Sequence, residues 1–369
     1  MSPAATSASG FWRNVIRRKT REAKVQGSTT PPLVAEFLQE CRTEVIGAMK
    51  PYLTSGAPAE YLYDLTADYP GRGGKAMRPS ICIATARAFG ATLSEVLHTA
   101  VAIELLHNAF LVHDDIEDES ELRRGAPALH AIHGIPLAIN AGDMLLLLAL
   151  RPLLDNRKSL GPGLALKVLS DAERMATESA EGQAMELGWR RDNVMDLNDD
   201  DYLVMVLKKT AWLGVIHPMR AGALIGTRGR ADLEPFIRLG FFLGAAFQIQ
   251  DDLLNLATGH RQYGKEPLGD LLEGKRTLML IHVFRNSARA ERSRLKSILA
   301  RPRSERRVED IRWIRRLMDE YGSLDYARKI AHGLAGAALH EFDSLFGAVK
   351  NSRDKDFLRG LTTWVFERI

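Results

Sequence analysis

The sequence predicts an all-α protein, a large bundle of helices joined by polar loops. Apolar residues recur with the helical period of about 3.6 almost throughout the chain after Pro32. Strand-like alternation between Asn-Gly or Asp-Gly turns is absent from the sequence. Of the 369 residues, 46% are hydrophobic and 26% are charged. This balance is ordinary for a folded domain and excludes a mostly disordered chain.

The chain divides by charge into residues 1–31, predicted to be a flexible basic leader, and residues 32–369, predicted to be one all-α domain. The first 25 residues hold six basic and one acidic side chain, a charge of +5, whereas the whole chain carries +4. A basic stretch that includes Phe11 and Trp12 is compatible with weak contact with an anionic membrane surface, but a solvated tail is the commoner case. Bases do not alternate with aromatics as in a nucleic-acid groove, so no nucleic-acid partner is expected.

The remaining composition favours a cytoplasmic location. The longest apolar runs, around Met144–Leu150 and Leu239–Ala246, fall short of the ~18–20 residues that span a bilayer. The N-terminus lacks the apolar core of a secretory signal. Two cysteines, Cys41 and Cys82, fit a reducing compartment.

The first candidate site along the chain is a Gly-rich turn, Gly71–Pro79, with the sequence GRGGKAMRP. It carries Lys75 and Arg78 and leads into a predicted helix. Glycines let a backbone approach an anion closely, and helix N-termini favour negative charge. The turn is therefore a candidate anion site.

An acidic segment, DDIEDESE, follows a strongly apolar helix predicted to run from Leu93 to Leu111. Asp114 and Asp118 are four residues apart, so on a helix they share one face. Two like charges at this spacing repel unless a cation lies between them, and Mg²⁺ prefers carboxylate oxygens and phosphates. Arg123 and Arg124 follow directly, and arginine is a preferred planar donor to phosphate.

A second acidic segment, Phe247–Asn255, also ends an apolar helix and contains Asp251 and Asp252. Two such ends in one bundle suggest metal sites that face each other across a cavity. Basic residues surround this segment in the sequence: Lys208, Lys209, Lys265 and Lys275.

Five motifs in this order, GGKAMRP, DDIED with RRG behind it, KKT, FQIQDD and GKEPLGDLLEGK, resemble those of the trans-isoprenyl diphosphate synthases of the polyprenyl synthetase family. The resemblance extends from about Gly73 to Thr277. It implies a fold of the isoprenoid synthase type, with helices around a central cavity, and a homodimer.

The resemblance also implies how an allylic diphosphate is held through Mg²⁺. The implied metal ligands are Asp114, Asp118 and Asp251, with Asp115 and Asp252 as supporting acids. The side chains implied to contact the allylic diphosphate are Arg123, Lys209, Lys265 and Lys275.

A second diphosphate, that of isopentenyl diphosphate, is implied to bind Lys75, Arg78, His107 and Arg124. In the implied reaction the allylic diphosphate (dimethylallyl, geranyl or farnesyl) ionises. Isopentenyl diphosphate then attacks the cation, and a proton is lost. Thr210 and Gln248 are implied to steady the cation, so that Lys209, Thr210, Gln248, Asp114 and Asp251 form the expected catalytic set. Two positions depart from the family pattern: Asn255 replaces a third acid, and Ala76 replaces a base.

The segments around the two acidic motifs look most like geranylgeranyl diphosphate synthases. Ala109 is small and Phe110 is large at the positions expected to govern chain length, so farnesyl or longer products are the alternatives. A class I terpene cyclase shares the first motif, but it does not need Lys75, Arg78 and His107 for a second diphosphate. A non-catalytic synthase subunit tends to lose leading aspartates, which both motifs keep here.

Overall fold

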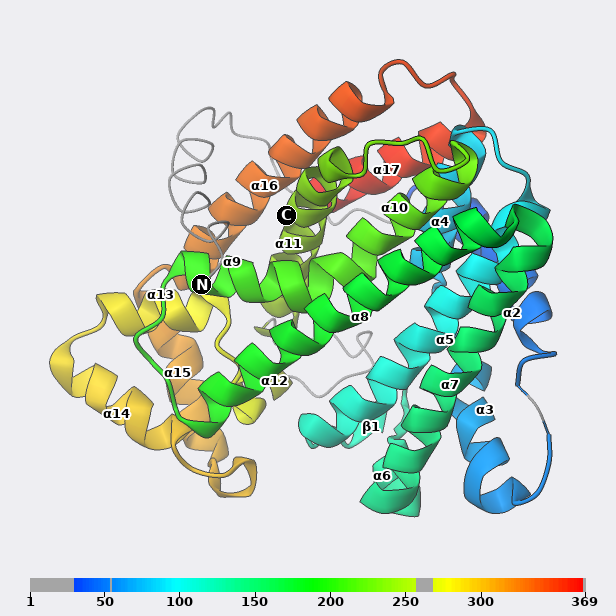
Figure 1. The fold of residues 1–369 in the computed structure, drawn as a ribbon. Coiled ribbons are helices and arrows are strands. Elements are labelled where there is room, and N and C mark those ends of the chain that lie inside the picture. Colours follow the sequence, from blue (N-terminus) through cyan, green and yellow to red (C-terminus); the bar gives the residue numbers. More distant parts are fainter. Residues whose placement is uncertain (1–29, 54, 257–267, 368–369) are drawn as a thin grey trace.

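The computed structural model describes residues 30–53, 55–256 and 268–367, and these residues are almost entirely helical (Figure 1). The predicted all-α class is confirmed. The predicted leader lies outside the described residues except for its last two positions.

In chain order, the helices up to residue 191 are α2 (Pro32–Met49), the π-helical turn η2 (Ala59–Tyr63), α3 (Asp64–Gly71), α4 (Met77–Ala88), α5 (Leu93–Glu117), α6 (Leu129–His133), α7 (Ile135–Leu160) and α8 (Pro162–Arg191). The later helices are α9 (Asp199–Val206), the π-helix η3 (Leu207–Ile216), α10 (His217–Gly226), α11 (Glu234–Leu256), α12 (Gly269–Glu273), α13 (Leu278–Asn286), α14 (Arg289–Leu299), the 3₁₀ turn η5 (Arg303–Glu305), α15 (Val308–Glu320), α16 (Ser323–Phe346) and α17 (Arg353–Glu367).

Helix α5 is the central helix, because it buries residues on all sides and packs against α7, α4 and α2. Its first turn is fixed by the Glu95 carboxylate, which accepts a hydrogen bond of 2.8 Å from the backbone N–H of Thr92. The helix ends at the first acidic motif, where Asp118 is the C-cap. Burial of its upstream turns thus places the acids at the end of a rigid element.

The segment from α9 to α10 is one continuous helix whose middle, η3, has the wider π-helical winding. It passes very close to α8: a side chain at Gly182 would clash with the backbone nitrogen of Lys209. The glycine therefore allows η3 to lie directly against α8. On the opposite side η3 packs against α11.

A two-residue hairpin, which the sequence pattern did not reveal, follows α5. Strand β1 (Leu122–Arg123) pairs antiparallel with β2 (Ala126–Pro127). The intervening Arg124 and Gly125 both have positive φ, 55° and 77°, as a type I′ turn requires. The turn separates the adjacent Arg123 and Arg124 side chains.

Two helices, α5 and α7, are long and apolar enough to cross a bilayer by length and composition alone. The sequence contains no unbroken apolar run of this length, because polar residues are interspersed along both helices. In α5, 67% of the most apolar window is buried inside the bundle, against 44% in α7. The apolarity of α5 is thus that of a core helix.

Candidate active site

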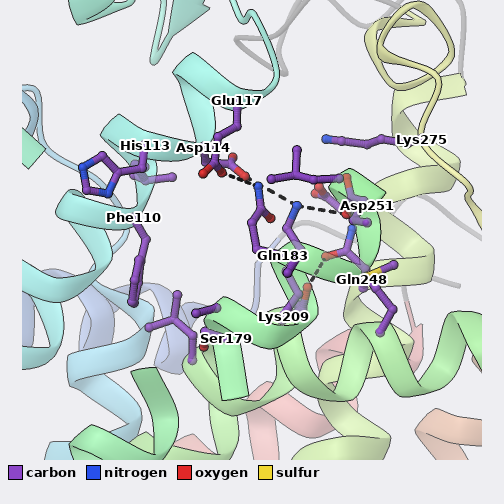
Figure 2. Close-up of a pocket in the computed structure, with 18 of the residues that line it drawn as sticks. Phe110, His113, Asp114, Glu117, Ser179, Gln183, Lys209, Gln248, Asp251 and Lys275 are labelled. Atoms are coloured by element: carbon purple, nitrogen blue, oxygen red, sulfur yellow. Dashed lines mark hydrogen bonds and ion pairs between the residues drawn. The ribbon is translucent and has the colours of Figure 1, made fainter. Parts of the chain in front are cut away.

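A cavity of about 500 Å³ lies between α5, α8, η3, α11 and the segment after α12 (Figure 2). One end carries acids and bases, and the other end is more apolar. Asp114 of α5 and Asp251 of α11 both line the charged end. The structure therefore brings the two acidic motifs to one cavity, as the sequence analysis expected.

The predicted ligand Asp118 and the predicted supporting acid Asp115 do not line this cavity within the described part of the chain, whereas Glu117 of the same motif does. Asp115 is fully buried, and it accepts hydrogen bonds from Tyr69 (2.5 Å) and from Arg123 Nε (2.9 and 3.0 Å). Asp118 is 2% exposed and forms ion pairs with Arg190 and, at 3.3 Å, with Lys275. Burial opposes ionisation of Asp118, but Lys275, Lys209 and Arg190 together hold its pKa below the ordinary value.

The π-helix η3 delivers Lys209 and Thr210 to the cavity wall. Lys209 Nζ lies 2.9 Å from Glu186 Oε2 and 3.5 Å from Asp114 Oδ1. Thr210 Oγ1 donates to Gln248 Oε1 at 3.0 Å, so the two residues expected to steady a cation do meet.

Asp252 lies behind Gln248 at the same end of the cavity. It accepts hydrogen bonds of 2.7 Å from Tyr202 Oη and from Gln248 Nε2. Burial and the nearby Asp270 raise the pKa of Asp252 to about 8. Through the hydrogen bond that it accepts from Nε2, the Asp252 carboxyl group orients the Gln248 side chain.

The segment after α11 contributes Lys275, whose ammonium lies 2.9 Å from Glu273, 3.3 Å from Asp118 and 3.4 Å from Asp270. Asn255, the departure in the second motif, is buried, and its side-chain oxygen accepts the backbone N–H of Asp270 at 3.1 Å. Asn255 thus anchors α12. The predicted Lys265 lies outside the described residues.

Helix α8 supplies a cavity wall that the sequence analysis missed. Gln183 and Glu186 line the charged end of the cavity, and Ser179 lines the apolar end. Gln183 donates to Glu117 at 2.5 Å. A signal was present: polar residues at positions 179, 183 and 186 fall on one helical face of an otherwise mixed sequence.

The acids at the charged end fit the way Mg²⁺ binds. The side chain of Glu186 is 7% exposed, and its Oε1 accepts no hydrogen bond from the described residues. The described residues contain no cluster of three His, Cys, Asp or Glu side chains arranged as a ready-made metal site. Mg²⁺ usually takes one or two carboxylates and completes its shell with waters and substrate phosphates, which Asp114 and Asp251 on opposite walls permit.

A second cavity, of about 180 Å³, adjoins the first. Its lining includes all four predicted residues of the second diphosphate site: Lys75, Arg78, His107 and Arg124. Arg78 Nη1 lies 3.2 Å from His107 Nε2, and Arg78 Nε is buried with no hydrogen-bond partner in the described part of the chain.

Electrostatics in the second cavity favour an incoming anion. Burial, with Arg124 nearby, lowers the pKa of Arg78 to about 10, despite the attraction of Glu104. Burial and Arg78 hold the pKa of His107 well below its ordinary value, so the imidazole is neutral. Arg78 and His107 line both cavities, so they form a shared wall.

The two predicted chain-length residues are placed differently. Phe110 lines the cavity and points toward its apolar end, near Ser179 (Figure 2). Ala109 is fully buried in the core. Among the described residues, Phe110 lines the cavity and Ala109 does not.

Comparisons with known proteins show what the chain is similar to in sequence and in fold. The family model for polyprenyl synthetase matches residues 59–318. A geranylgeranyl pyrophosphate synthase of Geoglobus acetivorans is 33% identical over 337 residues, which are 91% of this chain and 99% of that protein. A geranylfarnesyl diphosphate synthase of Natronomonas pharaonis is 30% identical over 84% of this chain and 89% of its own. The crystal structure of a geranylgeranyl pyrophosphate synthetase from Pyrococcus horikoshii Ot3 superposes with a TM-score of 0.79 at 30% identity, covering 91% of this chain and 98% of the other.

Proposed function

The chain belongs to the polyprenyl synthetase family and is a trans-prenyltransferase; from this premise we propose that it condenses isopentenyl diphosphate with allylic diphosphates to give geranylgeranyl diphosphate. The allylic substrates are dimethylallyl, geranyl and farnesyl diphosphate, and the metal is Mg²⁺. The observation that carries the proposal is the pair of adjoining cavities: one is lined by acids and bases together, and in the other the charged side chains are mainly basic. A terpene cyclase needs no second diphosphate site, so this pair disfavours that alternative.

The allylic diphosphate occupies the charged end of the large cavity. Asp114 and Asp251 are the residues that would hold Mg²⁺, with Asp115, Asp118 and Asp252 as supporting acids, and bound Mg²⁺ supplies charge neutralisation on the departing pyrophosphate. The bases that contact this diphosphate are Arg123, Lys209, Lys265 and Lys275. In the unliganded protein, Lys209 and Lys275 are held by acids, so they are already in place for an anion.

The allylic cation forms beside Thr210 and Gln248, whose hydrogen bond fixes their oxygens in position. Such preorganised dipoles stabilise a developing charge without reorganisation. Isopentenyl diphosphate, held by Lys75, Arg78, His107 and Arg124, presents its double bond from the second cavity. The released pyrophosphate accepts the proton, since burial and Arg78 hold the pKa of His107 too low for the imidazole to act as a general base.

The growing chain extends toward the apolar end of the large cavity, where Phe110 lies (Figure 2). A geranylgeranyl product is supported by the names of relatives, while geranylfarnesyl diphosphate synthases also occur among them. Leu145 and Leu148 of α7 are core residues that do not line this cavity in the described part of the chain.

A homodimer in the cytoplasm completes the proposal. Helix α7 exposes an apolar row in which Ile139 is 43%, Leu147 61% and Leu154 52% exposed, and such a row is typical of an interface. Both cysteines are free and buried, as expected in a reducing compartment. Light scattering of the wild type and of Leu147→Glu tests the dimer: the wild type should be dimeric and the variant monomeric.

The test of function is incubation of the purified protein with isopentenyl diphosphate and each allylic diphosphate, with Mg²⁺ or with chelator. Chromatography of the dephosphorylated alcohols should show geranylgeraniol that disappears with chelator. A shorter or longer alcohol would correct the product, and no elongation by the folded protein would favour the non-catalytic subunit.

A further inference from the structure

One wall of the second cavity comes from α17, the last helix of the chain. Trp364 lines this cavity together with Lys75, Arg78 and Arg124, and its side chain is 4% exposed. The family match ends at residue 318. The wall therefore comes from a segment beyond the part that identifies the family.

Packing fixes the position of α17. The ring of Phe357 stacks on Phe37 of α2 with centroids 4.1 Å apart. Asp354 pairs with Arg87 of α4 at 3.2 Å. Trp364 lies two turns after Phe357, on the same helical face, so the anchored first half of the helix determines where the indole ring stands.

The indole ring faces a base of the cavity. Lys75 Nζ lies 5.8 Å from the centroid of the Trp364 ring, within the range of a cation–π contact. Lys75 is exposed and its ammonium ends a flexible four-carbon stem, so a contact with a fixed ring narrows the positions that the ammonium samples. The Trp364 ring therefore favours positions of the ammonium at the wall of the cavity that Arg78 and Arg124 also line.

We infer that Trp364 is a positioning residue for isopentenyl diphosphate: it forms one wall of the second cavity and helps to hold the Lys75 ammonium at the diphosphate site. This inference rests on the proposed function. The inferred role of Trp364 is limited to the affinity for isopentenyl diphosphate, because Trp364 does not line the larger cavity in the described part of the chain. The rate of ionisation and the affinity for the allylic diphosphate do not depend on it.

The test compares Trp364→Ala and Trp364→Phe with a matched control, Trp313→Phe. Trp313 also carries a cation over its ring, Arg294 at 4.1 Å, but it lines neither cavity in the described chain. Trp364→Ala should raise KM for isopentenyl diphosphate about 3- to 30-fold, the range of a lost cation–π contact. Trp364→Phe should give a smaller rise, because phenylalanine is the weaker partner. The kcat and the KM for farnesyl diphosphate should stay within about twofold of wild type, and the control should match wild type throughout.

A binding measurement keeps the inference separate from the proposed function. Isopentenyl diphosphate alone, without allylic substrate, should quench tryptophan fluorescence in wild type and in Trp313→Phe but not in Trp364→Phe. In a double-mutant cycle, Trp364→Phe and Lys75→Ala should be non-additive. Unchanged KM and unchanged quenching in folded Trp364→Phe would overturn the inference while leaving the synthase activity standing. An inactive wild type that still shows Trp364-dependent quenching would instead overturn the proposed function alone.

Discussion

The two cavities differ in how their charges are balanced. In the large cavity acids and bases are already paired, as Lys209 is with Glu186 and Asp114. In the small cavity, among the described residues, the lining has three cationic side chains and one carboxylate, Glu104. A paired site attracts a diphosphate only when additional cations arrive, whereas a basic site binds one directly. Under the proposed function, we therefore expect the allylic diphosphate to need Mg²⁺ for binding and isopentenyl diphosphate to bind without it.

The largest effect on activity is expected when a carboxylate that faces the large cavity is removed. Asp251→Asn should lower kcat about 10³-fold or more, because a bound metal supplies several kcal/mol of charge stabilisation. Steady-state kinetics with farnesyl and isopentenyl diphosphate measures this. Asn255→Asp is the matched control and should have little effect, since a carboxylate still accepts the backbone N–H of Asp270. Equal losses in both variants would contradict the assignment.

The adjacent arginines of the hairpin test the two cavities separately, because Arg123 lines the large cavity and Arg124 lines the small one. Arg124→Gln should raise KM for isopentenyl diphosphate about 10- to 100-fold, as expected for a lost hydrogen bond to a charged group, without changing KM for the allylic substrate. Arg123→Gln should affect the allylic substrate instead. It should also lower thermal stability, since it leaves the buried Asp115 without its guanidinium partner. The same kinetic change in both variants would refute two separate sites.

A substitution at Glu186 tests the metal dependence of the large cavity. Glu186 lies on α8, whose contribution to the cavity wall was not predicted from the sequence. Glu186→Gln keeps an acceptor for Lys209 but removes a charge, so the Mg²⁺ concentration for half-maximal activity should rise about 10-fold. Calorimetric titration of Mg²⁺ in the presence of pyrophosphate gives a second readout. Glu181→Gln, on the same helix, changes an exposed acid that binds Lys208 and should leave both quantities unchanged. An unaltered Mg²⁺ requirement in Glu186→Gln would mean that Glu186 holds Lys209 and does not contribute to metal binding.

The smallest effect on rate is expected at the apolar end. Phe110→Ala should leave total turnover within about threefold and shift products toward longer chains, because removing the ring lengthens the cavity. Leu145→Val is the control: this fully buried residue lines no cavity in the described chain, so the product should not change. Chromatography of the dephosphorylated alcohols measures both. An unchanged product in Phe110→Ala would place the length determinant elsewhere.

Much of this site was predictable because local patterns carry it. Acids that end an apolar helix must lie at the rim of a core, and this placed Asp114 and Asp251. Side-chain direction at a helix end was not predictable. Asp115 and Asp118 turn toward Arg123 and Arg190, partners set by a hairpin and a helix far along the chain. Glu186 and Trp364 were missed because each lies in a helix without a local motif, and only tertiary packing brings them to a cavity.

The most direct test of the central claim is calorimetric binding of two ligands, each with Mg²⁺ and with excess chelator. One is isopentenyl diphosphate, and the other is a non-ionising thiolo analogue of farnesyl diphosphate. The account predicts that chelator abolishes binding of the farnesyl analogue and leaves the affinity for isopentenyl diphosphate nearly unchanged. Equal sensitivity of both ligands to chelator would contradict it, because the two cavities would then bind diphosphate by the same means.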